Sequence, residues 1–214
     1  MEPYVRPALP AQEFRDAEGT VIPYGERWGM GSPPDDAYSV LTHAERFQPL
    51  HDVARALIAY LECAYDVTAS EDPAYVADLP ENYVAATTAV RLTPAGADSA
   101  PMTIAFTSHP GVVVRAGAVY VEPFPVCGCD ACDDTAESEA ERLESTVFGI
   151  VSGGLKEYLT GPRRKVFAYD LTVADGGSSG TQGTHAFSPE RLKTARATLR
   201  DRSGAWAPWS FRES

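Results

Sequence analysis

The sequence has no hydrophobic run long enough to cross a membrane as a helix. None of its 214 residues lie in a stretch approaching the roughly 18 consecutive apolar residues that mark a candidate span. The opening segment, Met1–Pro7, also lacks the basic and then apolar pattern of a secretory leader. These two absences predict a cytoplasmic protein with no membrane partner.

Basic residues are scarce. The chain holds 18 Lys and Arg against 30 Asp and Glu, which gives a formal net charge of −12. An acidic chain without a basic stripe is repelled by phosphate backbones, so nucleic acid is excluded as a partner. The same charge is compatible with an unknown protein partner, in particular a basic one.

The usual catalytic motifs are missing as well. The sequence has no G-x-S-x-G elbow, no H-E-x-x-H, no phosphate-binding P-loop and no G-x-G-x-x-G ahead of a helix. No catalytic residue and no organic cofactor site is therefore assigned, and whether the protein is an enzyme is left open.

The residue pattern predicts one α+β domain over residues 1–214. An irregular arm (1–41) is rich in proline but carries scattered aromatics, which predicts that it packs across the domain. The core (42–160) has helices predicted at Pro49–Tyr65 and Thr135–Leu159, from apolar residues spaced by three and four and from S/T/D-x-x-E capping boxes at Thr42 and Asp134.

Between these helices the chain alternates β-rich segments with turns. The predicted strands are Val84–Leu92, Met102–Phe106, Val112–Arg115 and Ala118–Val121. Their short links predict a small antiparallel sheet, with both helices packed on one of its faces. The remainder (161–214) reads as a further strand from Lys165 to Val173, a Gly/Ser loop, a short helix and a Trp-rich end.

The most distinctive chemical feature is a cluster of three cysteines, Cys127, Cys129 and Cys132; the fourth, Cys63, stands alone. Three thiolates on one tight loop suit a zinc ion, which prefers four tetrahedral ligands. The fourth ligand is not in the run. The candidates are Asp130, Asp133, Cys63 and His109.

Other interpretations of the cluster remain open. Cys129 and Cys132 form a C-x-x-C pair that suits thiol redox chemistry, but the surrounding aspartates disfavour a thiolate. A bound dication would neutralise thiolates and carboxylates together, which favours a metal. An iron–sulfur cluster fits less well, because C-x-C-x-x-C departs from ferredoxin spacing. Three reduced, unligated thiols are the remaining alternative.

A resemblance adds context to this cluster. The run Phe124–Asp134, FPVCGCDACDD, is similar to the signature of an uncharacterised actinobacterial protein family, as are Tyr38–Leu50 and the closing Trp206–Trp209. The resemblance covers roughly Tyr38 to Tyr158 and implies a cytosolic bacterial protein with a domain of unknown function. It implies no activity.

These observations together predict a binding protein with a structural zinc on Cys127, Cys129 and Cys132. The zinc would pin the end of the last predicted strand to the start of the second helix, and zinc coordination in peptides contributes on the order of 10 kcal/mol. A zinc-dependent hydrolase or a C-x-x-C thiol oxidoreductase is the alternative.

Overall fold

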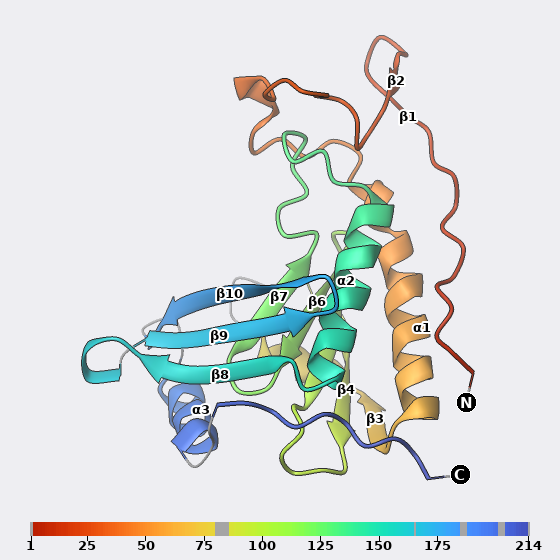
Figure 1. Cartoon of the computed structure of the whole chain (residues 1–214). Helices are drawn as coiled ribbons and strands as arrows, with labels where there is room; N and C mark the ends of the chain where they lie inside the picture. Colours follow the sequence, from red (N-terminus) through yellow and green to blue (C-terminus); the bar gives the residue numbers. More distant parts are fainter. Residues whose placement is uncertain (1, 80–85, 165, 185–187, 201–203, 214) are drawn as a thin grey trace.

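The computed structural model describes residues 2–79, 86–164, 166–184, 188–200 and 204–213 (Figure 1). Its helices are α1 (Pro49–Ala64), α2 (Ala136–Val151) and α3 (Pro189–Arg200). Its strands are β1 (Phe14–Arg15), β2 (Val21–Ile22), β3 (Val67–Glu71), β4 (Ala86–Pro94), β5 (Met102–Thr107), β6 (Gly111–Ala116), β7 (Tyr120–Phe124), β8 (Leu155–Thr160), β9 (Val166–Val173) and β10 (Gly176–Gly183).

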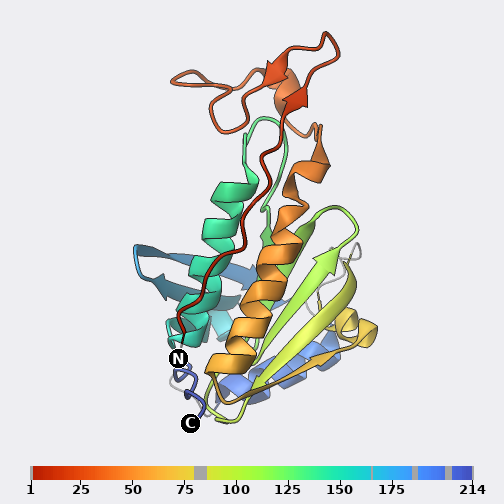
Figure 2. The same cartoon turned by 90° about the vertical axis from the view of Figure 1, so that its right-hand side faces the viewer.

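In the described part of the chain, the strands form three antiparallel sheets: β1-β2, β10-β9-β8 and the five-stranded β3-β4-β5-β6-β7. The largest sheet is a meander, because each of its strands pairs with the next one in sequence. Figure 2 shows α1 and α2 side by side, with α1 in front of this sheet and α2 in front of the blue strands of the second sheet. The predicted antiparallel sheet is confirmed, but the prediction of two helices on one face of a single small sheet is only partly matched, because α2 also packs on β9 and because a second sheet and α3 are present.

Alternation along the strands divides the sheet into two faces. Val90, Ile104 and Val114 face the helices and belong to the main core, which contains the buried residues of α1 and α2. Ala89, Ala105 and Val113 face the other way and pack in a smaller cluster with Leu79.

The predicted first helix is confirmed to within one residue, since α1 spans Pro49–Ala64. The capping box at Thr42 is not formed. His43, in the left-handed region with φ of 50°, precedes a 3₁₀ helix at Ala44–Phe47 without a side-chain cap. The four predicted strands correspond to β4 to β7 with shifted ends, and Val84 with Ala85 lies outside the described residues.

The second predicted helix is wrong in its last part. α2 ends at Val151, and Leu155–Thr160 is the strand β8 rather than the end of a helix. Gly153 causes the break, because its φ of +81° is incompatible with a continuing right-handed helix. The helix also begins one residue later than the Asp134 box predicts: Thr135 is the N-cap, and its hydroxyl accepts the amide of Ser138 at 3.1 Å.

Two segments expected to be irregular are regular. The predicted Gly/Ser loop contains β10, which pairs along its whole length with β9. The segment after α1, where no strand was predicted, contains β3, followed by a 3₁₀ helix at Pro73–Asp78. The short C-terminal helix is confirmed as α3. The described part of the chain contains no helix long and apolar enough to cross a membrane.

Both ends of the chain contact the main core, the N-terminal arm through Tyr4 and Leu9. Tyr4 packs edge-on against Tyr60 and Phe148, and its hydroxyl donates to Glu144 at 2.8 Å. Figure 2 shows this part of the arm running between α1 and α2. At the other end, Trp206 and Trp209 are buried, with 5% and 3% of their surfaces exposed.

Candidate metal centre

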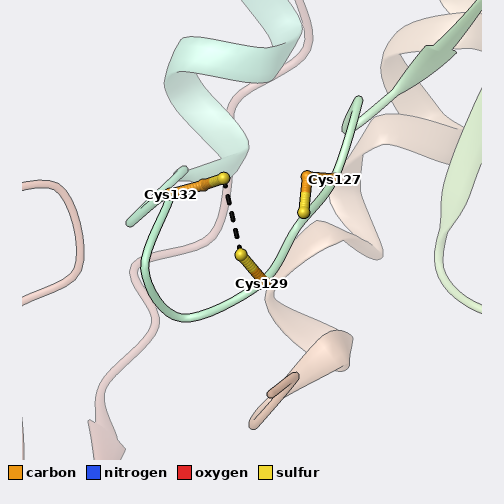
Figure 3. A group of neighbouring side chains, drawn as sticks. All are labelled: Cys127, Cys129 and Cys132. Atoms are coloured by element: carbon orange, nitrogen blue, oxygen red, sulfur yellow. Dashed lines mark hydrogen bonds between the residues drawn. The ribbon is translucent and has the colours of Figure 1, made fainter. Parts of the chain in front are cut away.

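The three clustered cysteines lie on the loop that joins the end of β7 to the start of α2. Their sulfur atoms all lie within 4.8 Å of one another, and the sulfurs of Cys129 and Cys132 are 3.5 Å apart. Figure 3 shows the side chains coming from different sides of the loop toward one region. Cys129 is buried, whereas Cys127 and Cys132 are exposed. The cluster can therefore hold a metal ion and is accessible from solvent.

The spacing of the sulfurs suits a thiolate-bound zinc. Zinc–sulfur distances of about 2.3 Å in a tetrahedron put the sulfurs about 3.8 Å apart. The observed separations of 3.5 Å up to 4.8 Å bracket this value. Binding thus needs sulfur movements of about 1 Å or less, which is within the reach of thiol side chains on an exposed loop.

Gly128 bends the backbone between the first two cysteines. Its φ is +72°, in the left-handed region that a side chain disfavours. A Cβ atom there would lie 2.9 Å from Cγ of Pro125 and 3.2 Å from Cε2 of Phe47. The absence of a side chain at this position therefore lets the backbone curl between the two thiols.

The buried side chain of Arg46 binds the backbone of the cysteine loop. Only 2% of its surface is exposed, and its guanidinium donates to four backbone carbonyl oxygens. Two of these belong to the cysteine loop, at Gly128 (2.8 Å) and Asp134 (3.1 Å), and two to the segment before α1, at Thr42 (2.6 Å) and His43 (3.3 Å). One buried side chain thus joins the loop to the entry of the first helix.

The N-terminal arm clamps the same loop from its other side. The amide of Asp130 donates to the carbonyl of Val40 at 2.8 Å, and the amide of Ala131 donates to that of Ala37 at 3.1 Å. Cys129, Ala131, Ala37 and Trp28 form a small apolar cluster. The loop is therefore held by hydrogen bonds and packing. The sequence had predicted only a zinc ion in this role.

The aspartates around the sulfurs have protein partners. The carboxylate of Asp130 accepts the amide and the hydroxyl of Thr42 at 3.1 and 2.7 Å, and lies 3.7 Å from Arg27. Asp133 accepts the amide of Arg27 at 2.8 Å. The negative field expected from the sequence is partly offset by Arg27 and Arg46, which lie far from the loop in sequence and close to it in space.

The thiols differ in proton affinity. Burial raises the pKa of Cys129, but hydrogen bonds from Cys127, Cys132 and the backbone outweigh it and lower this pKa to about 7. Burial, with hydrogen bonds to the other two cysteines, raises the pKa of Cys132 to about 12. Cys132 also lies three residues before the N-cap, outside the first turn of α2, where the helix dipole would stabilise a thiolate.

None of the four candidates for a fourth ligand joins the sulfur group among the described residues. Asp130 and Asp133 are engaged with Thr42 and Arg27 as above, and neither belongs to the group. Cys63 is on the last turn of α1, at the opposite end of that helix from the loop. His109 lines a cavity of about 310 Å³ whose wall also contains Cys127.

Sequence reasoning missed Arg27 and Arg46. Neither has a local signal, because their partners are backbone and carboxylate groups about 80 to 106 residues away. An arginine next to an aromatic residue in sequence is also common at exposed positions. Only the three-dimensional arrangement therefore identifies the roles of Arg27 and Arg46.

Comparison with known protein families assigns the chain to a family. Residues 10–213 match a family of unknown function, DUF6226. The chain belongs to this family. The match covers the arm from residue 10 onward, the cysteine loop and the tryptophan-rich end, so Trp28, Ala37, Val40 and Arg46, which contact the cysteine loop, all lie within the DUF6226 region. Neither the curated proteins nor the solved structures give a match to the chain.

Proposed function

We propose that this DUF6226 protein binds one zinc ion through Cys127, Cys129 and Cys132, and that it acts by binding rather than by turnover. The convergence of three sulfurs within 4.8 Å on a braced, accessible loop carries the proposal. All four cysteines are free thiols, which fits a reducing compartment such as a bacterial cytoplasm.

Among the described residues, no fourth protein ligand belongs to the sulfur group, and this affects what a bound zinc could do. With three ligands in place among the described residues, the fourth position is open to water or to a donor from a binding partner. The zinc then has two effects: it adds rigidity to a loop that Arg46 already braces, and it offers an outward-facing coordination position.

The partner is a protein, and the net charge of −12 favours a basic one. The glutamates of α2 are poorly suited to bind a basic partner, because several of them already pair with arginines of this chain. Glu137 and Glu144 contact Arg6, and Glu139 is buried and paired with Arg142 at 2.7 Å. The exposed end of the molecule around the cysteine loop is the better candidate surface.

Zinc titration of the reduced, chelator-treated protein in competition with a chromophoric chelator tests the proposal. We expect about one zinc per chain, and we expect Cys127→Ser, Cys129→Ser and Cys132→Ser each to weaken binding about tenfold or more. Cys63→Ser is the matched control, because it removes an exposed thiol at the far end of α1 and should bind zinc like the wild type. A wild type that takes up no zinc, or cysteine-loop variants that match the control, would contradict the proposal.

The 3.5 Å separation of the Cys129 and Cys132 sulfurs supports thiol–disulfide exchange as a second candidate function. In that case Cys129→Ser and Cys132→Ser should abolish reduction of a test disulfide in the presence of a chelator, while Cys127→Ser should not. The zinc proposal predicts instead that all three variants fail together in metal binding. The burial of Cys129 makes it a poor attacking thiol, so we favour zinc.

A further inference from the structure

A cavity of about 310 Å³ lies beside the cysteine loop. It is lined by the turn between β5 and β6, by the segment just before α1, and by the chain that leaves β7 and enters the loop. Pro125 and Gly128 contribute to this wall, and so does Cys127, whose side chain is exposed. The cavity and the sulfur group therefore share a residue, and a molecule in the cavity lies next to any metal that the sulfurs hold.

Most of the cavity wall is apolar, and part of it belongs to the main core. Phe47, Val112 and Phe124 line the cavity and each have only 1% of their surface exposed, so their side chains are fixed by packing from behind. The hydroxyl of Thr107, a polar group of the wall, already donates to the carbonyl oxygen of Gly111 at 3.1 Å. The wall thus offers a bound molecule mainly apolar contacts.

The size of the cavity suits a molecule of about two rings. An apolar cavity of about 150 Å³ holds one benzene molecule, and this cavity is about twice as large. Its volume lies at the lower end of the range for small-molecule sites. Arg46 binds the carbonyl oxygen of Gly128, so this part of the wall is in place before a ligand arrives, which lowers the cost of binding.

The charge around the sulfur group favours a neutral donor at the open zinc position. Three thiolates outweigh the two positive charges of zinc, and Asp130 and Asp133 add two carboxylates, which Arg27 and Arg46 balance at most. A further thiolate or carboxylate would add negative charge, whereas an aromatic nitrogen is neutral and suits zinc. In a tetrahedral site the fourth donor atom lies about 3.8 Å from each sulfur, so it contacts Cys127 at the wall of the cavity.

We propose that the zinc and this cavity together bind a small, uncharged aromatic nitrogen heterocycle. The ring nitrogen takes the fourth coordination position of the zinc, and the apolar body of the molecule fills the cavity against Phe47 and Phe124. The inference rests on the zinc site proposed above and names the class of ligand that its open position takes.

Spectroscopic titration of the full chain loaded with cobalt(II) tests the inference. Cobalt(II) replaces zinc in tetrahedral thiolate sites, and its visible absorption changes when the fourth ligand changes. The probe is 4-phenylimidazole at mildly alkaline pH, where its ring is neutral. We expect a saturable spectral change, with binding about tenfold or more tighter than that of imidazole, because the phenyl ring is buried in the cavity. The metal-free chain should bind 4-phenylimidazole at least about tenfold more weakly than the loaded chain.

A surface residue of the wall provides a variant that leaves the core intact. Leu41 lines the cavity and is 37% exposed. We expect Leu41→Ala to weaken the binding of 4-phenylimidazole about threefold or more and to leave that of imidazole within about twofold. Val40→Ala is the matched control, because this neighbouring side chain is 43% exposed and is not part of the wall. It should bind both probes like the wild type.

The outcomes separate the ligand from the metal. A chain that shows no cobalt–thiolate absorption would refute the zinc site and the ligand with it, whereas a loaded chain that does not respond to 4-phenylimidazole would refute the ligand alone. Binding that appears only in His109→Ala would show that His109 fills the fourth position. Tighter binding of the peptide acetyl-His-Phe-amide than of 4-phenylimidazole would assign the cavity to side chains of a protein partner. Either result, or equal losses in Leu41→Ala and Val40→Ala, would overturn the inference.

Discussion

Nη2 of Arg46 donates to the carbonyl oxygen of Gly128 at 2.8 Å, across 82 residues of sequence. This bond joins the 3₁₀ helix that precedes α1 to the bend between the first two clustered cysteines. Arg46 also reaches Asp134, two residues before the first residue of α2, so the two main helices and the cysteine loop share one buried cation. The position of the sulfurs is therefore set largely by a residue outside the loop.

Replacing Arg46 with Ala should destabilise the protein by about 3 kcal/mol or more. The substitution removes hydrogen bonds from a charged donor to four buried or half-buried carbonyls, each worth about 1.5 kcal/mol or more. Urea unfolding measures the change. Arg55→Ala is the control, because that arginine is exposed on α1 and its guanidinium contacts only the ring of Phe106 at 4.5 Å among the interactions described, a contact worth about 1 kcal/mol or less. Equal losses in the two variants would show that Arg46 does not brace the loop.

Replacing Gly128 with Ala should destabilise the protein by roughly 2 kcal/mol and weaken zinc binding. The new Cβ would have both a disfavoured backbone conformation and close contacts with Pro125 and Phe47, whose ring belongs to the core. Gly19→Ala separates these two causes: its φ is +85°, but a Cβ there meets no atom within 4 Å. It should lose about 1 kcal/mol and keep its zinc affinity, and the difference between the variants measures the contact. A Gly128→Ala variant that binds zinc as tightly as Gly19→Ala would refute the role of this bend.

Replacing Trp206 with Phe should cost more stability than replacing Trp209 with Phe. Both indoles are buried, but Trp206 donates to the carboxylate of Glu157 at 2.7 Å, whereas Trp209 donates to the carbonyl of Ala100 at 2.9 Å. A hydrogen bond to a charged group is worth about 1.5 to 3 kcal/mol, against about 1 kcal/mol for a neutral one. The pair is matched in size and burial, so denaturant midpoints compare the two bonds directly. A larger loss in Trp209→Phe would show that Glu157 is satisfied without Trp206.

The parts of the fold that sequence could predict are those with local causes. The apolar residues of α1 repeat at the helical period, and turn-forming residues mark the links between β4 and β7. The positions of these elements could therefore be predicted from short stretches of sequence. The end of α2 was missed because Leu155 and Tyr158 continue the helical spacing of the residues before them, whereas the positive φ of Gly153 ends the helix. β10 was missed because its Gly and Ser residues signal a loop, and only pairing with β9 makes it a strand.

The candidate site divides in the same way. Three cysteines within six residues are visible in any window, so the sequence alone identified the group. The contacts that the arm, Arg27 and Arg46 make with the cysteine loop could not be predicted in this way, since they join residues roughly 80 or more positions apart. The argument from crowded aspartates was incomplete for the same reason: it counted only charges close in sequence, and the compensating arginines are close only in space.

Zinc affinity should rise with pH between about pH 6 and about pH 8. A thiol must lose its proton to bind the metal, and the pKa of Cys132 near 12 means that this thiol is protonated throughout the range, while Cys129, with a pKa near 7, is partly so. Binding therefore releases at least one proton, and because protons are products of the reaction, lowering their concentration strengthens binding. Competition titrations at several pH values give the slope, and calorimetry in buffers of different ionisation enthalpy counts the protons. Cys63→Ser should leave the slope unchanged and Cys132→Ser should reduce it; an affinity independent of pH would mean that the thiols are not the ligands.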